Sequence, residues 1–151
     1  MNQCRNYFHS SLIVTTFLST GFFFLNADVN AQSSGILTVE ASNFRGTQGK
    51  ATVNLFRSQD EIPKKPFVQL VASITNSKAI LQTQDIPYGD YAAILFHDEN
   101  TNGILDHRLG FPNEAMGFSN GWKLSLFSGM PTFEKLKFTF NEKNASIAIK
   151  L

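Results

Sequence analysis

Residues 98–106 carry oxygen-bearing side chains at alternate positions, followed by a glycine and a further carboxylate. This is the spacing by which a short loop wraps a calcium ion, with the glycine at the sharp turn. Gly103 occupies that turn position when the count starts at Asp98. The candidate ligands are then Asp98, Asn100, Asn102, the backbone carbonyl of Ile104, and Asp106. All of them are hard oxygen donors, so calcium is the expected ion.

The loop departs from an EF-hand at its twelfth position. Leu109 stands where an EF-hand carries a bidentate glutamate, and a strand pattern, not a helix, leads into Asp98. Glu114 is a candidate for the missing carboxylate, although spacing alone does not establish that it reaches the loop. With two carboxylates and neutral amides in the loop itself, the expected calcium affinity is modest, with a dissociation constant of about 10⁻⁴ to 10⁻³ M.

A metal-free interpretation of the same residues stays open. Asp, Asn and Gly favour turns without any ion, because their short side chains accept hydrogen bonds from neighbouring backbone groups. Composition and spacing therefore predict an ordered loop at residues 98–106. They do not choose between a calcium site and a cluster of turns.

Two histidines, His97 and His107, flank the loop. They have no recognised metal-ligand spacing, so a structural hydrogen-bonding role is expected for them. The alternative to a binding protein is a small extracytoplasmic hydrolase that uses Asp98, Glu114 or His97. That alternative predicts a concave pocket that holds at least two of these three side chains with perturbed protonation.

The amino-terminal residues have the three parts of a secretory signal. Arg5 gives a positive start, residues 11–25 form an apolar run, and Val29 and Ala31 are the small residues before a cleavage site after Ala31. Residues 1–31 are therefore expected to be a signal peptide, and residues 32–151 a single secreted or periplasmic domain. Cys4 is the chain's one cysteine, so the mature chain has no thiol for a disulfide or a thiolate metal site.

Charge is nearly balanced along the chain of 151 residues, with a net charge of +1. The lysines are scattered, which argues against nucleic-acid binding. No membrane association is expected after signal cleavage. We therefore expect a non-enzymatic binding or structural module, whose partner is another extracytoplasmic protein or a surface glycan.

The mature chain consists of short runs in which apolar and polar residues alternate, with turn residues between them. Period-two alternation is typical of half-buried strands, and about seven such runs favour an all-β antiparallel sandwich. The runs are residues 37–41, 51–55, 68–74, 79–82, 91–96, 136–140 and 147–151. Of these, the run 91–96 is nearly continuously apolar, as expected for a central strand that is covered on both faces. Most phenylalanines are expected to fill the core. The exception is the stretch 111–130, where Phe111, Phe118 and Trp122 would offer an apolar platform for a ligand.

Several segments together resemble a known bacterial family. Residues 86–91, Ile-Pro-Tyr-Gly-Asp-Tyr, resemble the turn that enters a strand in transthyretin-like sandwiches. The motif of residues 97–106, the Gly-Phe-Pro-Asn-Glu-Ala-Met-Gly-Phe-Ser-Asn run at 110–120, and Pro-Thr-Phe-Glu at 131–134 resemble the exported domain-of-unknown-function family 2141. The resemblance implies an exported transthyretin-like or immunoglobulin-like β-sandwich and no particular activity. It also couples the loop of Asp98 to the segment of Glu114 as one signature.

Overall fold

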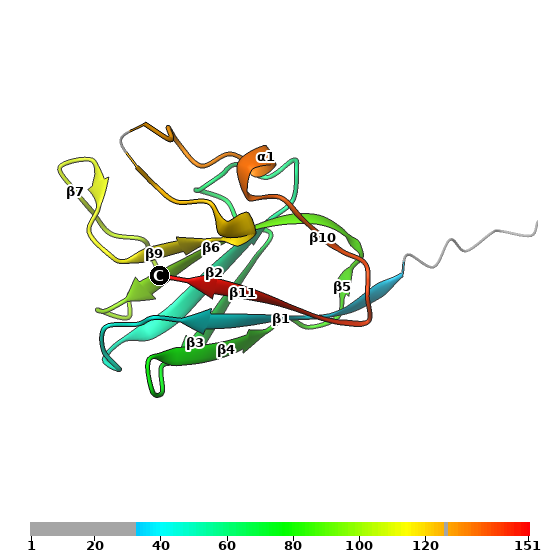
Figure 1. Ribbon diagram of the computed structural model, residues 1–151, viewed down its shortest axis with the longest axis horizontal. Coiled ribbons are helices and arrows are strands. Elements are labelled where there is room, and N and C mark those ends of the chain that lie inside the picture. Colours follow the sequence, from blue (N-terminus) through cyan, green and yellow to red (C-terminus); the bar gives the residue numbers. More distant parts are fainter. Residues whose placement is uncertain (1–32, 126) are drawn as a thin grey trace, which may run out of the picture. The chain divides into compact units, whose positions relative to one another are not determined.

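The computed structural model describes residues 33–125 and 127–151 (Figure 1). These residues belong to one compact unit, residues 31–151. The signal sequence predicted at residues 1–31 lies outside the described residues. Among the residues that are described, no helix has the length and apolar character needed to cross a membrane.

The chain folds into two facing β-sheets with short additional segments. One sheet has the order β11 (Asn144–Lys150), β1 (Ser34–Ser42), β4 (Lys78–Gln82), with β5 (Ile86–Pro87) also paired to β1. The other has the order β10 (Phe138–Phe140), β6 (Gly89–Asp98), β2 (Lys50–Phe56), β3 (Val68–Ser73), with β9 (Met116–Phe118) also paired to β6. The remaining elements are the hairpin of β7 (His107–Arg108) and β8 (Phe111–Pro112), the 3-10 turn η1 (Ser119–Gly121) and the helical turn α1 (Phe133–Leu136).

The predicted all-β sandwich is confirmed. Its pairings are antiparallel, except that the last strand, β11, runs parallel to β1, with Val39 opposite Ile147. Parallel neighbours need a long connection, and here nearly the whole domain lies between β1 and β11. This pairing places the first and the last strand of the domain side by side in one sheet.

All seven predicted runs correspond to strands, although Ile74 and Leu151 lie one residue beyond the ends of β3 and β11. One further residue was placed in the wrong kind of element. Leu136 was expected in a strand with Phe138 and Phe140, but it ends the helical turn α1, and β10 starts only at Phe138. Leu136 is nevertheless fully buried. Period-two spacing and a single helical turn can both bury the same residue, which is why alternation alone misplaced it. The short strands β5, β7, β8 and β9 were not predicted.

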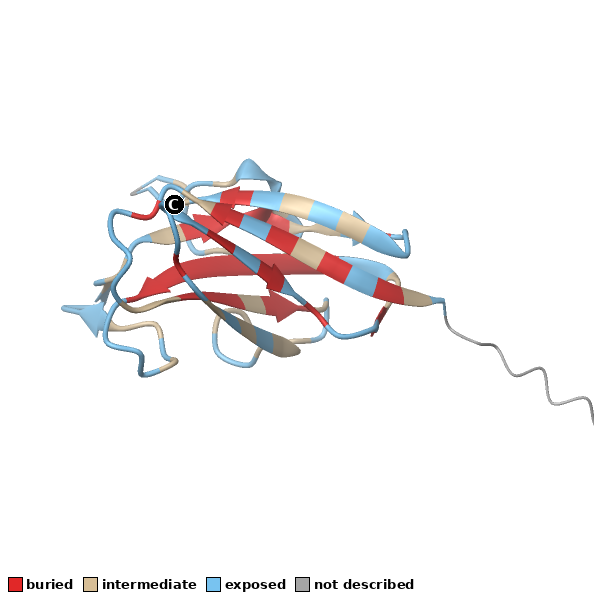
Figure 2. Cartoon of the chain, turned by 90° about the horizontal axis from the view of Figure 1, so that it is seen from below, coloured by how far each residue is buried: buried red, intermediate tan, exposed pale blue. Residues whose placement is uncertain are grey.

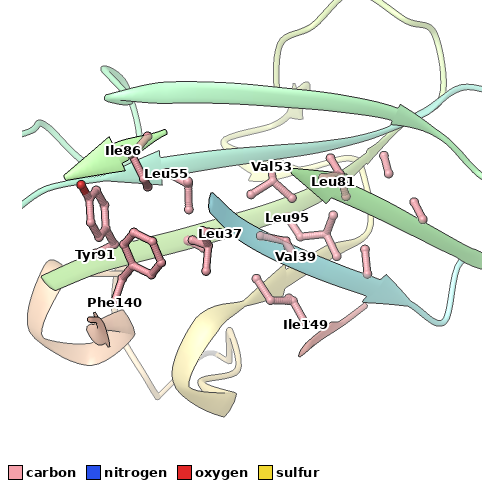
Figure 3. Packing of buried hydrophobic residues seen from close by; sticks show 14 of the residues in the cluster. Leu37, Val39, Val53, Leu55, Leu81, Ile86, Tyr91, Leu95, Phe140 and Ile149 are labelled. Carbon is pink, nitrogen blue, oxygen red and sulfur yellow. The ribbon is translucent and has the colours of Figure 1, made fainter. Parts of the chain in front are cut away.

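The main hydrophobic core fills the space between the two sheets (Figure 3). Its members come from alternate positions of the facing strands, among them Leu37 and Val39 of β1, Val53 of β2 and Leu95 of β6. Figure 2 shows the alternation along β1, where buried and more exposed residues follow one another. The hydrophobic effect of this burial holds the domain without disulfides.

Strand β6 is buried on both faces, as its nearly continuous apolar run predicted. Tyr91, Ala93 and Leu95 face the main core. Ala92 and Ile94 face a second cluster, which is completed by Phe56, Phe118 and Leu136. Because β6 is fixed from both sides, its last residue, Asp98, is a rigid starting point for the loop that follows.

Candidate functional site

The loop begins at a buried carboxylate. The Asp98 side chain, in a residue only 1% exposed, accepts hydrogen bonds from the backbone N–H of Asn102 (3.1 Å) and of Gly103 (2.8 Å). Thr101 and Gly103 have φ angles of 62° and 76°, which turn the chain back toward Asp98. Both carboxylate oxygens are therefore held in place by the turn that they help to form.

Two asparagine side chains connect the middle of the loop to its end. The amide nitrogens of Asn100 and Asn102 lie 2.6 and 3.1 Å from oxygens of the Asp106 carboxylate. Their amide oxygens accept the backbone N–H groups of Asn102 (3.0 Å) and Ile104 (2.8 Å), respectively. Four of the predicted ligands thus share one hydrogen-bond network, namely Asp98, Asn100, Asn102 and Asp106, and the N–H of Ile104 enters it too.

Glu114 joins this network from the second segment. Its carboxylate accepts the backbone N–H of Glu99 and of Asp106, each at 3.3 Å. The backbone N–H of Asn113 donates to the carbonyl of Asp106 at 2.8 Å, which fixes the two segments to each other. The structure therefore brings Glu114 to the loop of Asp98, the one relation that residue spacing alone left open.

The electrostatics of the network are those of an uncompensated acidic group. Three carboxylates, Asp98, Asp106 and Glu114, belong to it, and none of the ion pairs in the described part of the chain involves them. Burial raises the pKa of Glu114 above its ordinary value of 4.5, and the charges of Asp98 and Asp106 raise it further. The backbone N–H groups of Asp106 and Glu99 oppose this rise in the pKa.

The chemistry of the donors suits calcium better than a transition metal. Among residues 33–125 and 127–151, no three His, Cys, Asp or Glu side chains are grouped so that they hold a metal ion by themselves. Calcium, however, takes six to eight oxygens and accepts amide and backbone carbonyl oxygens beside carboxylates. The amides of Asn100 and Asn102 are the additional oxygen donors that this loop offers.

A β-hairpin with a two-residue turn follows the loop. Arg108 of β7 pairs with Phe111 of β8, and the turn between them is Leu109–Gly110, with φ angles of 52° and 82°. Positive φ at both central residues is the type I′ turn, which favours Asn-Gly. A leucine in this conformation costs about 1–2 kcal/mol, and the Leu109 side chain is 93% exposed. It therefore gains no burial in return.

An apolar hollow of about 500 Å³ lies beside this hairpin. One wall comes from the hairpin region, including Leu105 and Phe111, and the other from the segment between η1 and α1, including Leu124 and Met130. The floor includes Met116 and Phe118 of β9. Phe118 is buried in the second cluster, and Trp122 packs edge-on against it at 4.7 Å between ring centroids. Of the predicted platform, only Phe111 is a largely exposed ring, with 66% exposure.

The three groups named for the hydrolase alternative do not share an open pocket wall. His97 is 4% exposed, its ring stands edge-on to Phe44, and its Nε2 donates to the carbonyl of Gln48 at 2.7 Å. Because a carbonyl only accepts, Nε2 carries the proton. Asp98 is buried, whereas Glu114 lines a second hollow, which adjoins the apolar one, together with Lys123 and Trp122. The expected structural role of His97 matches these contacts.

Three residues that support the loop gave no clear signal in the sequence. Gly49, with a φ of 78°, packs so closely on the backbone of Asp98 that an added Cβ would overlap the carbonyl oxygen. Gln69 donates to the carbonyl of Gly103 (3.0 Å) and to Asn54 (2.9 Å). Gln48 holds His97. An isolated glycine is a signal of close backbone approach, but the sequence does not say which backbone approaches.

Comparison with protein families gives one match. Residues 39–148 match the model of a family described as "Uncharacterized protein conserved in bacteria (DUF2141)". The chain belongs to this family. The DUF2141 match spans β1 to β11 and includes both segments of the network around Asp98. Comparisons with curated proteins and with solved structures find no match.

Proposed function

We propose that this DUF2141 protein is an exported, non-enzymatic binding module whose binding end is organised by the 98–106 loop, and that calcium stabilises this loop. Asp98, Asn100, Asn102, Asp106 and Glu114 would supply side-chain oxygens, and Ile104 its backbone carbonyl. The proposal rests on one observation above all. Three carboxylates from two segments share a single hydrogen-bond network, and among the described ion pairs no cationic side chain pairs with them.

Physical chemistry favours a cation at such a place. Carboxylates within one network repel each other, and burial makes the charged form of Glu114 still more costly. A calcium ion would offset this repulsion. The asparagine amides, which donate hydrogen bonds to Asp106 without the ion, would then turn their oxygens toward the calcium. The position of Asp98 already resembles that of a first calcium ligand, because the turn presents its carboxylate toward the loop centre.

The apolar hollow supports a binding role for this end of the sandwich. It is bordered by residues of the hairpin that the loop carries, so an ordered loop also fixes one wall of the hollow. Concave and mostly apolar sites of this size are typical of binding sites. The loop would thus serve as a support and the hollow as the contact surface.

A melting curve with and without calcium tests the proposal. For a dissociation constant of about 10⁻⁴ to 10⁻³ M, 10 mM calcium would stabilise the folded state by about 1.4–2.7 kcal/mol. We expect a rise of several degrees in the melting temperature, because about 1 kcal/mol shifts a domain of this size by several degrees. Magnesium at the same ionic strength is the control for general salt effects, since it demands a tighter octahedral site.

The variant Asp106→Asn should abolish most of the calcium-dependent shift, since it removes one carboxylate but keeps the shape of the side chain. Asp90→Asn is the matched control, because Asp90 is an exposed aspartate that contacts Thr139, far from the loop in the strand pairing. An equal shift in the wild type and Asp106→Asn, or no shift in either, would contradict the proposal.

A further inference from the structure

We infer that the end of the sandwich beside the 98–106 loop docks on a phospholipid bilayer with anionic headgroups, through apolar side chains at the tips of two neighbouring segments. We call these the hairpin tip, residues 108–111, and the second tip, residues 124–125 and 127–130. The inference rests on the proposed function only in taking this end of the sandwich as the binding end. It needs no bound calcium.

The first observation is the conformation of Leu109. It occupies the first central position of a type I′ turn, where asparagine is the favoured residue, and it is almost fully exposed. An apolar residue is thus placed where it is both strained and hydrated. A strained residue without a local benefit points to a role outside the folded domain itself.

The second observation is that the apolar groups gather and protrude. Phe127 is 99% exposed and Met130 69%, both on the second tip. Phe111 and Leu124, also exposed, come from the hairpin tip and the second tip respectively, and both line the same hollow, which places the two tips beside each other. Both segments lie on the same side of the sandwich in Figure 1. Protruding side chains on separate tips suit insertion between lipid chains better than contact with a flat protein surface.

The third observation is the charge beside each tip. Arg108 precedes Leu109 and Lys123 precedes Leu124, and both basic residues are exposed. Within the described residues, neither belongs to an ion pair. No carboxylate is among the residues that line the apolar hollow. Cations adjacent to exposed apolar side chains fit an anionic membrane surface, where each contributes to attraction.

The acidic network lies at the base of the hairpin, not at its turn. Asp106 directly precedes strand β7 (His107–Arg108), and Leu109 follows that strand at the turn. The sequence alone predicted no membrane association after signal cleavage. The exposure of Leu109 and Phe127, which the sequence does not reveal, is the reason for proposing otherwise.

Vesicle sedimentation tests the inference. Residues 32–151 are suitable because both hydrophobic clusters lie within them and residues 31–151 form one compact unit. The apolar run at 11–25, which would bind lipid by itself, is thereby excluded. In the presence of a chelator, we expect binding to phosphatidylcholine vesicles that contain phosphatidylglycerol, and several-fold weaker binding to phosphatidylcholine alone.

Two variants should reduce the partition coefficient without unfolding the domain. Leu109→Asn suits the type I′ turn better than leucine, so it should keep or raise the melting temperature and lower lipid binding by about tenfold. Phe127→Ser should lower it at least as much. Ile80→Ser is the matched control, because Ile80 is a 58% exposed apolar residue on β4, outside both tips.

Three outcomes would overturn the inference. They are no sedimentation with anionic vesicles, unchanged binding of Leu109→Asn and Phe127→Ser, and an equal loss in Ile80→Ser. A dimer that Leu109→Asn dissociates, with no lipid binding, would assign the tips to a second copy of the chain instead. The calcium-dependent melting shift, measured on the same preparation, is independent of all these results. A shift without lipid binding would leave the proposed function intact and reject the membrane partner.

Discussion

Glu114 accepts a hydrogen bond from the backbone N–H of Asp106, with 3.3 Å between Oε2 and the nitrogen. This contact joins two segments that the hairpin of β7 and β8 separates in the chain. A substitution in either segment should therefore alter the conformation of the other.

Gly49→Ala should destabilise the domain by about 2 kcal/mol or more. The substitution adds a Cβ that overlaps the Asp98 carbonyl, at a φ of 78° that L residues rarely adopt. Urea unfolding measures the loss. The control is Gly46→Ala, three residues away, where no heavy atom lies within 4 Å of the added Cβ. Equal stabilities of the two variants would show that the close approach to Asp98 is unimportant.

Thr52→Val should stabilise the domain by about 1 kcal/mol. Thr52 is fully buried, and among the described residues its hydroxyl has no hydrogen-bond partner. Replacing it with a methyl group removes an unsatisfied polar atom and keeps the shape of the side chain.

Thr83→Val should change the stability of the domain in the opposite direction, and it serves as the comparison for Thr52→Val. Thr83 is also buried, but its hydroxyl accepts the backbone N–H of Leu37 at 2.9 Å. The same chemical change should therefore cost about 1–3 kcal/mol, because it leaves that N–H unpaired. Chemical denaturation of both variants gives the two signs. A loss of stability in Thr52→Val would contradict the explanation.

Stability should fall in acid partly through Asp60. The side-chain hydrogen bond from Arg57 holds the pKa of Asp60 below its ordinary value of 3.8. A carboxyl group whose pKa is lower in the folded state contributes stability above its unfolded pKa, and this contribution disappears as the pH falls through the folded pKa. Asp60→Asn should flatten the acid limb of the stability curve below about pH 4. The effect should be small, because the Arg57 side chain is 40% exposed and solvent screens the pair. An unchanged acid limb in the variant would refute this assignment.

The long strands were predictable because alternation is a local property. Leu37, Val39 and Ala41 face the core from one side of β1, and this pattern is visible in the sequence without any partner strand. Strands of two or three residues, such as β7 and β8, are too short to show a period. Leu136 was misplaced because a single helical turn buried the residue that the alternation had placed in a strand.

The candidate site was predictable to a smaller degree. The spacing from Asp98 to Asp106 predicted an ordered loop, and the resemblance to the family linked it to Glu114. What holds the loop from outside, such as Gly49 and Gln69, depends on which backbone segments meet in the fold. The exposure of Leu109 was also unpredictable, because its turn conformation follows from the pairing of Arg108 with Phe111.

A calcium titration followed through backbone amide NMR resonances shows whether calcium binds in the 98–106 loop. We expect saturable shifts at Asn102 and Gly103, whose N–H groups bond to the Asp98 carboxylate. They should give a dissociation constant of about 10⁻⁴ to 10⁻³ M. The amides of Asn76 and Ser77, in the turn that joins β3 to β4, should stay unchanged. Unmoved resonances at Asn102 and Gly103 up to 10 mM calcium, well above that range, would contradict calcium binding in this loop.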